Sequence, residues 1–112
     1  MLMDKRKMNR EKIMNLIVGN LNIVQKYLED NNINDLYKDS IFLHAVTFRV
    51  EVVCRIILKF RNDLKDIYDE KDFIYFKNLS NLLKDYSKNH CVDLRYFVIK
   101  KLPYLNTKAE NV

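Results

Sequence analysis

The stretch SIFLHAVTFRVEVVCRIILKF, residues 40–60, decides the fold. Its apolar residues recur at steps of three and four, which is the period of an α-helix. The β-branched run RVEVV inside it would also suit a strand, but the apolar segment is too long for one and no matching strands occur elsewhere. The stretch therefore predicts a long helix from about Ser40 to Leu64, with Asp39 or Ser40 as its N-cap.

This helix carries two adjacent apolar faces. One consists of Ala45, Phe48, Val52, Ile56 and Lys59, and the other of Phe42, Val46, Arg49, Val53, Ile57 and Phe60. One face can pack inside the domain, so the second requires a partner from outside. For a domain of this size the simplest partner is a second copy of the chain, and we expect a homodimer.

Three further segments have the same helical period. They run over about 9–30, over about 73–86 with Asp72 as the cap, and over about 93–102 with Asp93 as the cap and Pro103 as the end. Their inward positions are Ile13, Leu16, Ile17, Leu21, Val24 and Leu28; Phe73, Phe76, Leu79, Leu82, Leu83 and Tyr86; and Leu94, Phe97, Val98 and Leu102. One Gly and one Pro in 112 residues argue against a turn-rich β-fold. We predict an all-α fold, an antiparallel bundle of four to five helices.

Composition and length indicate one helical domain over residues 1–112, with residues 1–8 as a flexible basic arm. The two cysteines, Cys54 and Cys91, lie far apart in the sequence, and with only two histidines they favour neither a metal site nor a disulfide framework. We therefore expect no metal and no cofactor. The sequence contains no apolar run long enough to span a bilayer and no signal-peptide pattern, so we expect a cytoplasmic protein without membrane contact.

Three segments, in their order along the chain, carry a family resemblance. They are AVTFRVEVVCRI at 45–56, LSNLLKDY at 79–86 and CVDLRYFVIKKLPYL at 91–105. Together they resemble the characteristic segments of HepT-like members of the HEPN superfamily, small helical proteins that pair with minimal nucleotidyltransferases in prokaryotic two-gene modules of the toxin–antitoxin type. The closing segment matches best, and the resemblance covers nearly the whole chain. It implies a HEPN-like bundle, a homodimer and a nucleotidyltransferase partner.

The resemblance also implies metal-independent RNA cleavage by an Arg and a His on one face of the third helix. Such a pair is chemically suited to the task, because Arg stabilises phosphoryl charge and His transfers a proton near neutral pH. In one register of the motif, Leu79 stands at the Arg position and Lys84 at the His position. In the register shifted by one residue, Asn81 matches the family Asn, and Ser80 and Asp85 take the two catalytic positions. Neither register contains Arg or His.

Other residues on or near the motif helix are candidate substitutes. Lys84 and Asp85 are the only candidates for catalysis on the motif helix, although a lysine keeps its proton at neutral pH. His90 lies beyond the motif and is expected at the surface, and His44 is expected as a partly buried imidazole. A glutamate position in the second helix of the family is occupied here by Arg55, which we place with Ser80 and Asn81 at the cleft. Tyr86 corresponds to the tyrosine that some family partners modify with AMP.

Three functions therefore compete. The first is a component of a toxin–antitoxin-type module with weak or no RNase activity, paired with a nucleotidyltransferase. The second is a non-catalytic helical dimer that binds RNA or a protein partner through a basic surface. Its cations would be Lys5, Arg6, Lys7, Arg10, Arg55, Lys77 and Lys84. The third is an endoribonuclease that uses substituted residues.

Overall fold

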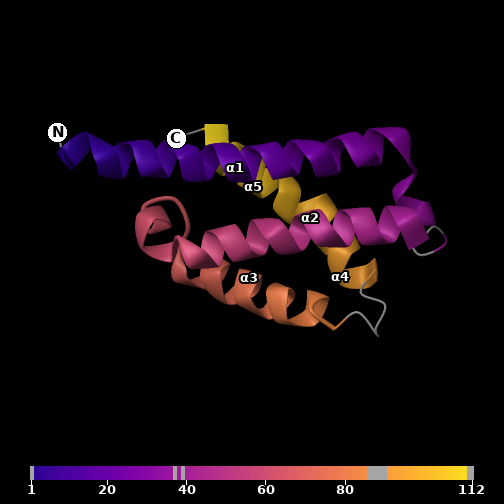
Figure 1. Ribbon diagram of the computed structural model, residues 1–112. Helices are drawn as coiled ribbons and strands as arrows, with labels where there is room; N and C mark the ends of the chain where they lie inside the picture. The colour runs from indigo at the N-terminus through magenta and orange to yellow at the C-terminus, as the bar shows by residue number, and fades with distance from the viewer. Residues whose placement is uncertain (1, 37, 39, 86–90, 111–112) are drawn as a thin grey trace.

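The computed structural model describes residues 2–36, 38, 40–85 and 91–110, and these residues form helices and connections without any strand. Helix α1 (Leu2–Asp30) runs antiparallel to α2 (Ser40–Lys59), and α3 (Glu70–Leu83) returns along α2 (Figure 1). A last helical stretch comprises α4 (Cys91–Tyr96), the π-helical turn η3 (Phe97–Lys101) and α5 (Leu102–Glu110). It crosses behind the other helices, with α4 against α2 and α5 against α1. The predicted all-α fold is confirmed as a helical bundle.

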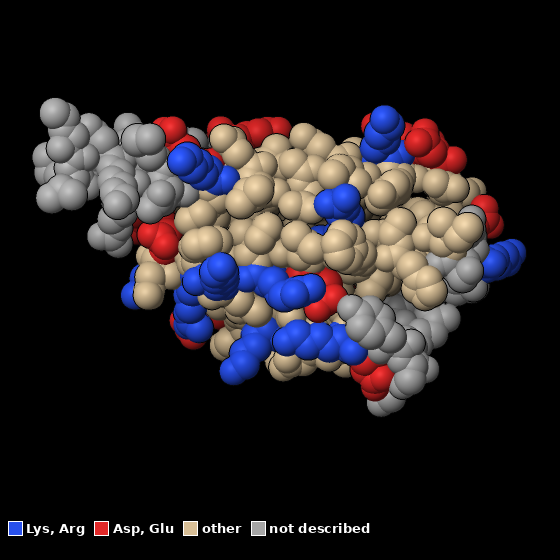
Figure 2. Space-filling view, viewed as in Figure 1, with Lys and Arg blue, Asp and Glu red and all other residues tan. Residues whose placement is uncertain are grey.

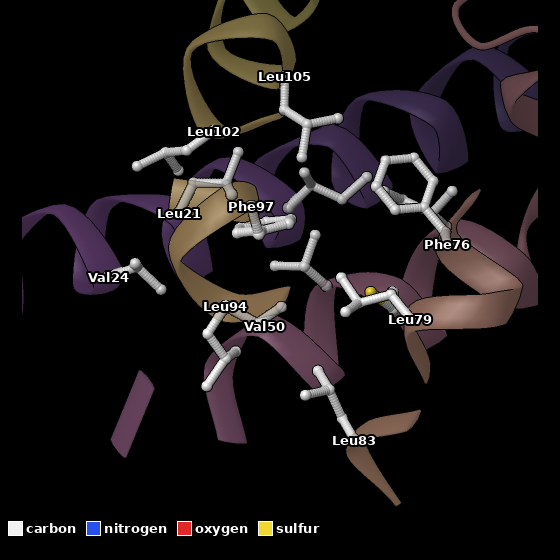
Figure 3. Close-up of a cluster of buried hydrophobic side chains, with 14 of the residues drawn as sticks. Leu21, Val24, Val50, Phe76, Leu79, Leu83, Leu94, Phe97, Leu102 and Leu105 are labelled. Carbon is white, nitrogen blue, oxygen red and sulfur yellow. The ribbon is translucent and has the colours of Figure 1, made fainter. Parts of the chain in front are cut away.

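The core lies where these helices meet, and Figure 3 shows side chains from each of them converging there. The predicted inward stripe of α1 is buried at Ile13, Ile17, Leu21 and Val24. Leu16, which we predicted on this stripe, is 53% exposed because it lies on the flank of the helix, and Met14 is buried instead. Most inward positions of the later helices are buried as predicted, namely Phe73, Phe76, Leu79, Leu83, Leu94, Phe97 and Leu102. Leu82, which we also predicted inward, is 43% exposed, and Val98 is half-buried.

Two helix boundaries, the start of α1 and the end of α2, differ from the prediction. The backbone is helical from Leu2 onward, so α1 begins before the predicted start near residue 9 and includes residues 2–8, which we predicted as a basic arm. Helix α2 ends at Lys59 rather than at Leu64, and a short 3-10 helix η2 (Arg61–Leu64) follows. Arg61 of this turn pairs with Glu70 and lies 4.8 Å from the ring centre of Phe73, which fixes the connection to the start of α3. The predicted cap residue Asp39 lies outside the described residues.

Helix α3 is capped by Asp69, not by the predicted Asp72. The Asp69 carboxylate accepts a hydrogen bond from the Asp72 backbone N–H at 2.9 Å, and the Asp72 carboxylate accepts one from the Asp69 N–H at 3.0 Å. This reciprocal capping box satisfies two backbone donors that the helix itself cannot pair. Asp72 is buried and also accepts a hydrogen bond from the Tyr104 hydroxyl at 2.8 Å, which ties α3 to α5.

Pro103 does not end the last helix as predicted, because α5 continues to Glu110. A proline in a helix lacks an N–H and its ring crowds the preceding turn. Here a π-helical turn comes directly before it, and the Leu102 N–H bonds to the Phe97 carbonyl rather than to the usual i−4 carbonyl. This wider turn accommodates the proline while Leu102 and Leu105 stay buried on either side of it.

Candidate functional site

The motif helix α3 presents its two alternative arginine positions to the interior. Leu79 is 3% exposed and Ser80 is 2% exposed, and Figure 3 shows the Leu79 side chain directed into the cluster of buried leucines and phenylalanines. In either register, the position of the family arginine is therefore buried in this chain. A buried position cannot present a cation to a phosphate.

The alternative histidine positions lie at the end of the same helix. Lys84 is the C-cap residue of α3 and is exposed, and Asp85 is half-buried, with its N–H bonded to the Leu82 carbonyl at 3.2 Å. Asn81, which we placed at the cleft, is exposed. His44 is exposed rather than partly buried. Tyr86, the predicted AMP acceptor, and His90 lie outside the described residues.

Arg55 is exposed and pairs with Glu51, one turn earlier on α2, at 3.4 Å. The Glu51 side chain is only 3% exposed, whereas the Arg55 side chain is 57% exposed. A buried carboxylate is rare in a helical core because ionised groups lose hydration there. We missed Glu51 in the sequence, although a single acid inside the apolar run RVEVVC was the available signal.

Cys54 lies one turn beyond Val50 on the buried side of α2. Burial, and secondarily the negative charge of Glu51, raise the pKa of the Cys54 thiol to about 12 from its ordinary value of 9.0. The thiolate is the reactive form of cysteine, so this thiol is inert at neutral pH. It contributes no nucleophile to the site.

The Cys54 thiol predicts a specific pH dependence of stability. Its pKa is higher in the folded protein than in the unfolded chain, so its stabilising effect is complete below pH 9 and is lost as the pH rises toward 12. We expect the free energy of unfolding to fall by about 1 kcal/mol between pH 8 and pH 10 on this account. Urea unfolding at the two pH values measures the difference, and Cys54→Ala should reduce it. An equal pH dependence in Cys54→Ala would contradict the assignment.

An apolar groove runs between α3 and α4. Its volume is about 270 Å³, and its lining comprises Tyr75, Asn78, Leu79, Leu82, Val92, Asp93 and Tyr96. The hydroxyl of Tyr75 is buried without a hydrogen-bond partner, and its pKa is raised by burial first and then by the nearby Cys54, Tyr96 and Asp93. The ammonium of Lys101 lies 4.6 Å from the centre of the Tyr75 ring. Sequence reasoning assigned this groove no role.

Lys and Arg side chains gather over the C-terminal half of α2 and over α3 (Figure 2). Four exposed cations of this region, Arg55, Lys59, Lys77 and Lys84, define what we call the basic surface. The cations that we predicted near the N-terminus do not all join it. Arg10 pairs with Asp66 at 3.3 Å, and the side chains of Lys5, Arg6 and Lys7 lie outside the described residues.

Two properties of the described part of the chain bear on its chemistry. It contains no group of three or more His, Cys, Asp or Glu side chains that could hold a metal ion. None of its helices combines the length and the apolar character needed to cross a membrane.

The comparisons with known proteins give no family for the chain. A scan against family models finds no match, and neither do searches of curated proteins and of solved structures. The site must therefore be interpreted from its own residues and from the sequence resemblance.

Proposed function

We propose that this protein is a HepT-like, HEPN-type component of a prokaryotic toxin–antitoxin module, that it pairs with a minimal nucleotidyltransferase in the cytoplasm, and that it cuts RNA weakly or not at all. Three features support the proposal: the order of the three resembling segments, the helical bundle in which they lie, and the composition of the third helix. The protein acts as a homodimer, because one of the two apolar faces of α2 is only partly covered in one copy. On this face Phe48 is exposed, and Ala45, Val52 and Ile56 are half-buried.

The proposal that the protein cuts RNA weakly or not at all, which we call its catalytic half, rests on the burial of Leu79 and Ser80. Metal-independent cleavage needs a group that stabilises the developing phosphoryl charge and a group that transfers protons near neutral pH. Neither possible arginine position can supply the first group. Lys84 can neutralise charge but is a poor proton carrier at neutral pH, and a carboxylate at Asp85 would repel the phosphate. A nuclease that uses these two residues is therefore the weakest of the three functions.

Two assays on the full chain test this function. Purified protein incubated with labelled tRNA and mRNA should leave both intact at neutral pH without metal. Coexpression with a nucleotidyltransferase encoded beside it should yield a stable complex, or a mass increase of one adenylyl group that Tyr86→Phe abolishes. RNA cutting that disappears in Lys84→Ala or Asp85→Ala would refute the catalytic half. Absence of both complex and modification would refute the module.

The basic surface favours one second candidate, a non-catalytic dimer that binds RNA. Its four exposed cations lie on two helices packed against each other. Contacts of this kind with phosphates release counterions, so binding would weaken steeply as salt is raised. Retention of RNA at low salt without cutting distinguishes this candidate from a purely protein-binding module.

A further inference from the structure

The outward face of the α1–α2 layer is broadly uncharged in Figure 2. It exposes Leu16, Ile41 and Phe48, by 53%, 80% and 52% respectively, and half-buried Val52 and Ile56 continue it along α2. A single exposed apolar side chain is ordinary on a soluble protein. A contiguous set along two packed helices instead marks a surface that a partner covers. We call it the α1–α2 face.

The exposed stripe of α2 is symmetric about its midpoint. Counting outward from the point between Phe48 and Arg49, Ala45 and Val52 are equally distant, and so are Ile41 and Ile56. When a helix packs antiparallel to a copy of itself across a two-fold axis, residues equally distant from the axis face each other. Apolar residues would then meet apolar residues on either side of a central pair formed by Phe48 and Arg49.

We propose that the α1–α2 face binds a second copy of this chain, with the two α2 helices antiparallel about a two-fold axis between Phe48 and Arg49. This interface deepens the homodimer of the proposed function by naming its face and its register. It places the Phe48 ring against the partner's Arg49, and Ala45 against the partner's Val52. The basic surface stays at the flank of each copy.

Arg49 is arranged to serve at the centre of such an interface. Its Nη1 donates a hydrogen bond to the Asn20 Oδ1 at 3.1 Å, and its guanidinium carbon lies 5.2 Å from the centre of the Phe48 ring. The Asn20 side chain is itself fixed by donating to the Leu16 carbonyl at 2.8 Å. The guanidinium is thus held against the surface, where it can stack on the partner's Phe48. Aromatic and Arg side chains dominate the energetic centres of protein interfaces.

Gly19 supplies an independent observation on α1. It is the only glycine of the chain, it lies exposed within the helix, and a Cβ added there would meet no atom within 4 Å. Glycine within a helix is unfavourable relative to alanine, and no contact inside the described protomer requires it. Gly19 lies between Leu16 and Ile23 on the same flank of α1. A two-fold axis that pairs α2 with α2 also brings α1 against α1, where a glycine permits close approach.

The size of the face favours a second copy as the occupant, and the charge of the chain does not prevent it. Helix α2 has 20 residues, so the two-helix face measures about 30 Å by about 20 Å, or roughly 600 Å² in projection. A stable interface takes roughly 800 Å² of accessible surface from each partner, which a face of this size approaches. Each copy carries a formal charge of +5, but the cations of the basic surface lie outside the contact, where salt screens them.

Sedimentation of the full chain tests the face. The wild-type protein should form a dimer, and Phe48→Lys should raise the dimer dissociation constant by roughly 30-fold or more, since it removes a central aromatic and opposes the partner's Arg49. Ile74→Lys is the matched control, because Ile74 is equally exposed, at 53%, but lies on α3. It should leave dissociation unchanged. A monomeric wild type, or equal effects of the two substitutions, overturns the proposal.

A charge pair tests the register. Ala45→Asp and Val52→Lys should each weaken the dimer, and the double variant should restore it, because each new Asp faces the partner's new Lys. The two positions are two turns apart in one helix and do not meet within a copy. Failure of the double variant to recover would overturn the antiparallel register, with circular dichroism confirming that each variant is folded. The nuclease and nucleotidyltransferase assays test the proposed function separately, because they do not depend on which face forms the dimer.

Discussion

Leu79→Arg is expected to unfold the protein rather than to restore a catalytic arginine. Leu79 is 3% exposed within the main core, so the substitution removes a buried aliphatic side chain and places an unpaired charge among apolar neighbours. Loss of the leucine alone costs about 2–5 kcal/mol, and the buried charge adds to that. The total free energy of unfolding of a domain of this size is about 5–15 kcal/mol. We expect a loss of at least about 4 kcal/mol in the free energy of unfolding, measured by urea denaturation.

Leu82→Arg is the matched control for this substitution. Leu82 lies on the same helix, within one turn of Leu79, and is 43% exposed. The long arginine stem can lie along the surface there with its charge in water, so the loss should stay within about 1 kcal/mol. If Leu79→Arg were as stable as Leu82→Arg, the burial of the motif position would be wrong. The central argument against a nuclease would then fail as well.

The alternative register makes the same prediction about Ser80. Its side chain is 2% exposed, so Ser80→Arg also forces a guanidinium into a space that holds a hydroxymethyl group. The conclusion about cleavage therefore does not depend on choosing a register. Both choices place the arginine position on the buried side of α3, because positions 79 and 80 lie on either side of the line through Phe76 and Leu83.

The sequence allowed the helical fold to be predicted because hydrophobic periodicity reports burial directly. Ile17 and Leu21 of α1, Val53 of α2 and Phe76 of α3 each belong to an apolar stripe with helical spacing. All four are fully buried. Helix ends were predicted less well, since they depend on competition between neighbouring polar groups. Asp69 and Asp72 both suit a cap, and only the position of Tyr104, which comes from a distant segment, makes Asp72 the buried member of the pair.

The candidate site was less predictable for the same reason. The buried state of Ser80 and Glu51 follows from how α2, α3 and α4 pack together, and a pattern within one helix does not contain that information. The continuation of α5 past Pro103 depends on a π-helical turn, which no single residue of the sequence predicts. The exposure of Phe48, by contrast, was predictable from the two apolar faces of α2, because the other helices of one copy cover only part of such a helix.

Asp72→Ala should cause a loss of stability well above that of an ordinary surface carboxylate. The Asp72 carboxylate accepts from the Asp69 N–H and from the Tyr104 hydroxyl at once, and it is 5% exposed. Its removal destroys half of a capping box, at about 1 kcal/mol, and leaves the Tyr104 hydroxyl without its acceptor, at about 1–3 kcal/mol. We expect a total loss of about 3 kcal/mol in the free energy of unfolding.

Two comparisons separate the parts of this effect. Tyr104→Phe removes both the donor and its need for a partner, so it should cost only about 1 kcal/mol, and the double variant should lose less than the sum of the two single variants. Asp66→Ala is the surface control, because this carboxylate is 79% exposed and its ion pair with Arg10 spans 3.3 Å. It should change stability by less than about 1 kcal/mol. Equal losses in Asp72→Ala and Asp66→Ala would show that Asp72 does not join α3 to α5, because only a buried carboxylate with two donors can account for the larger value.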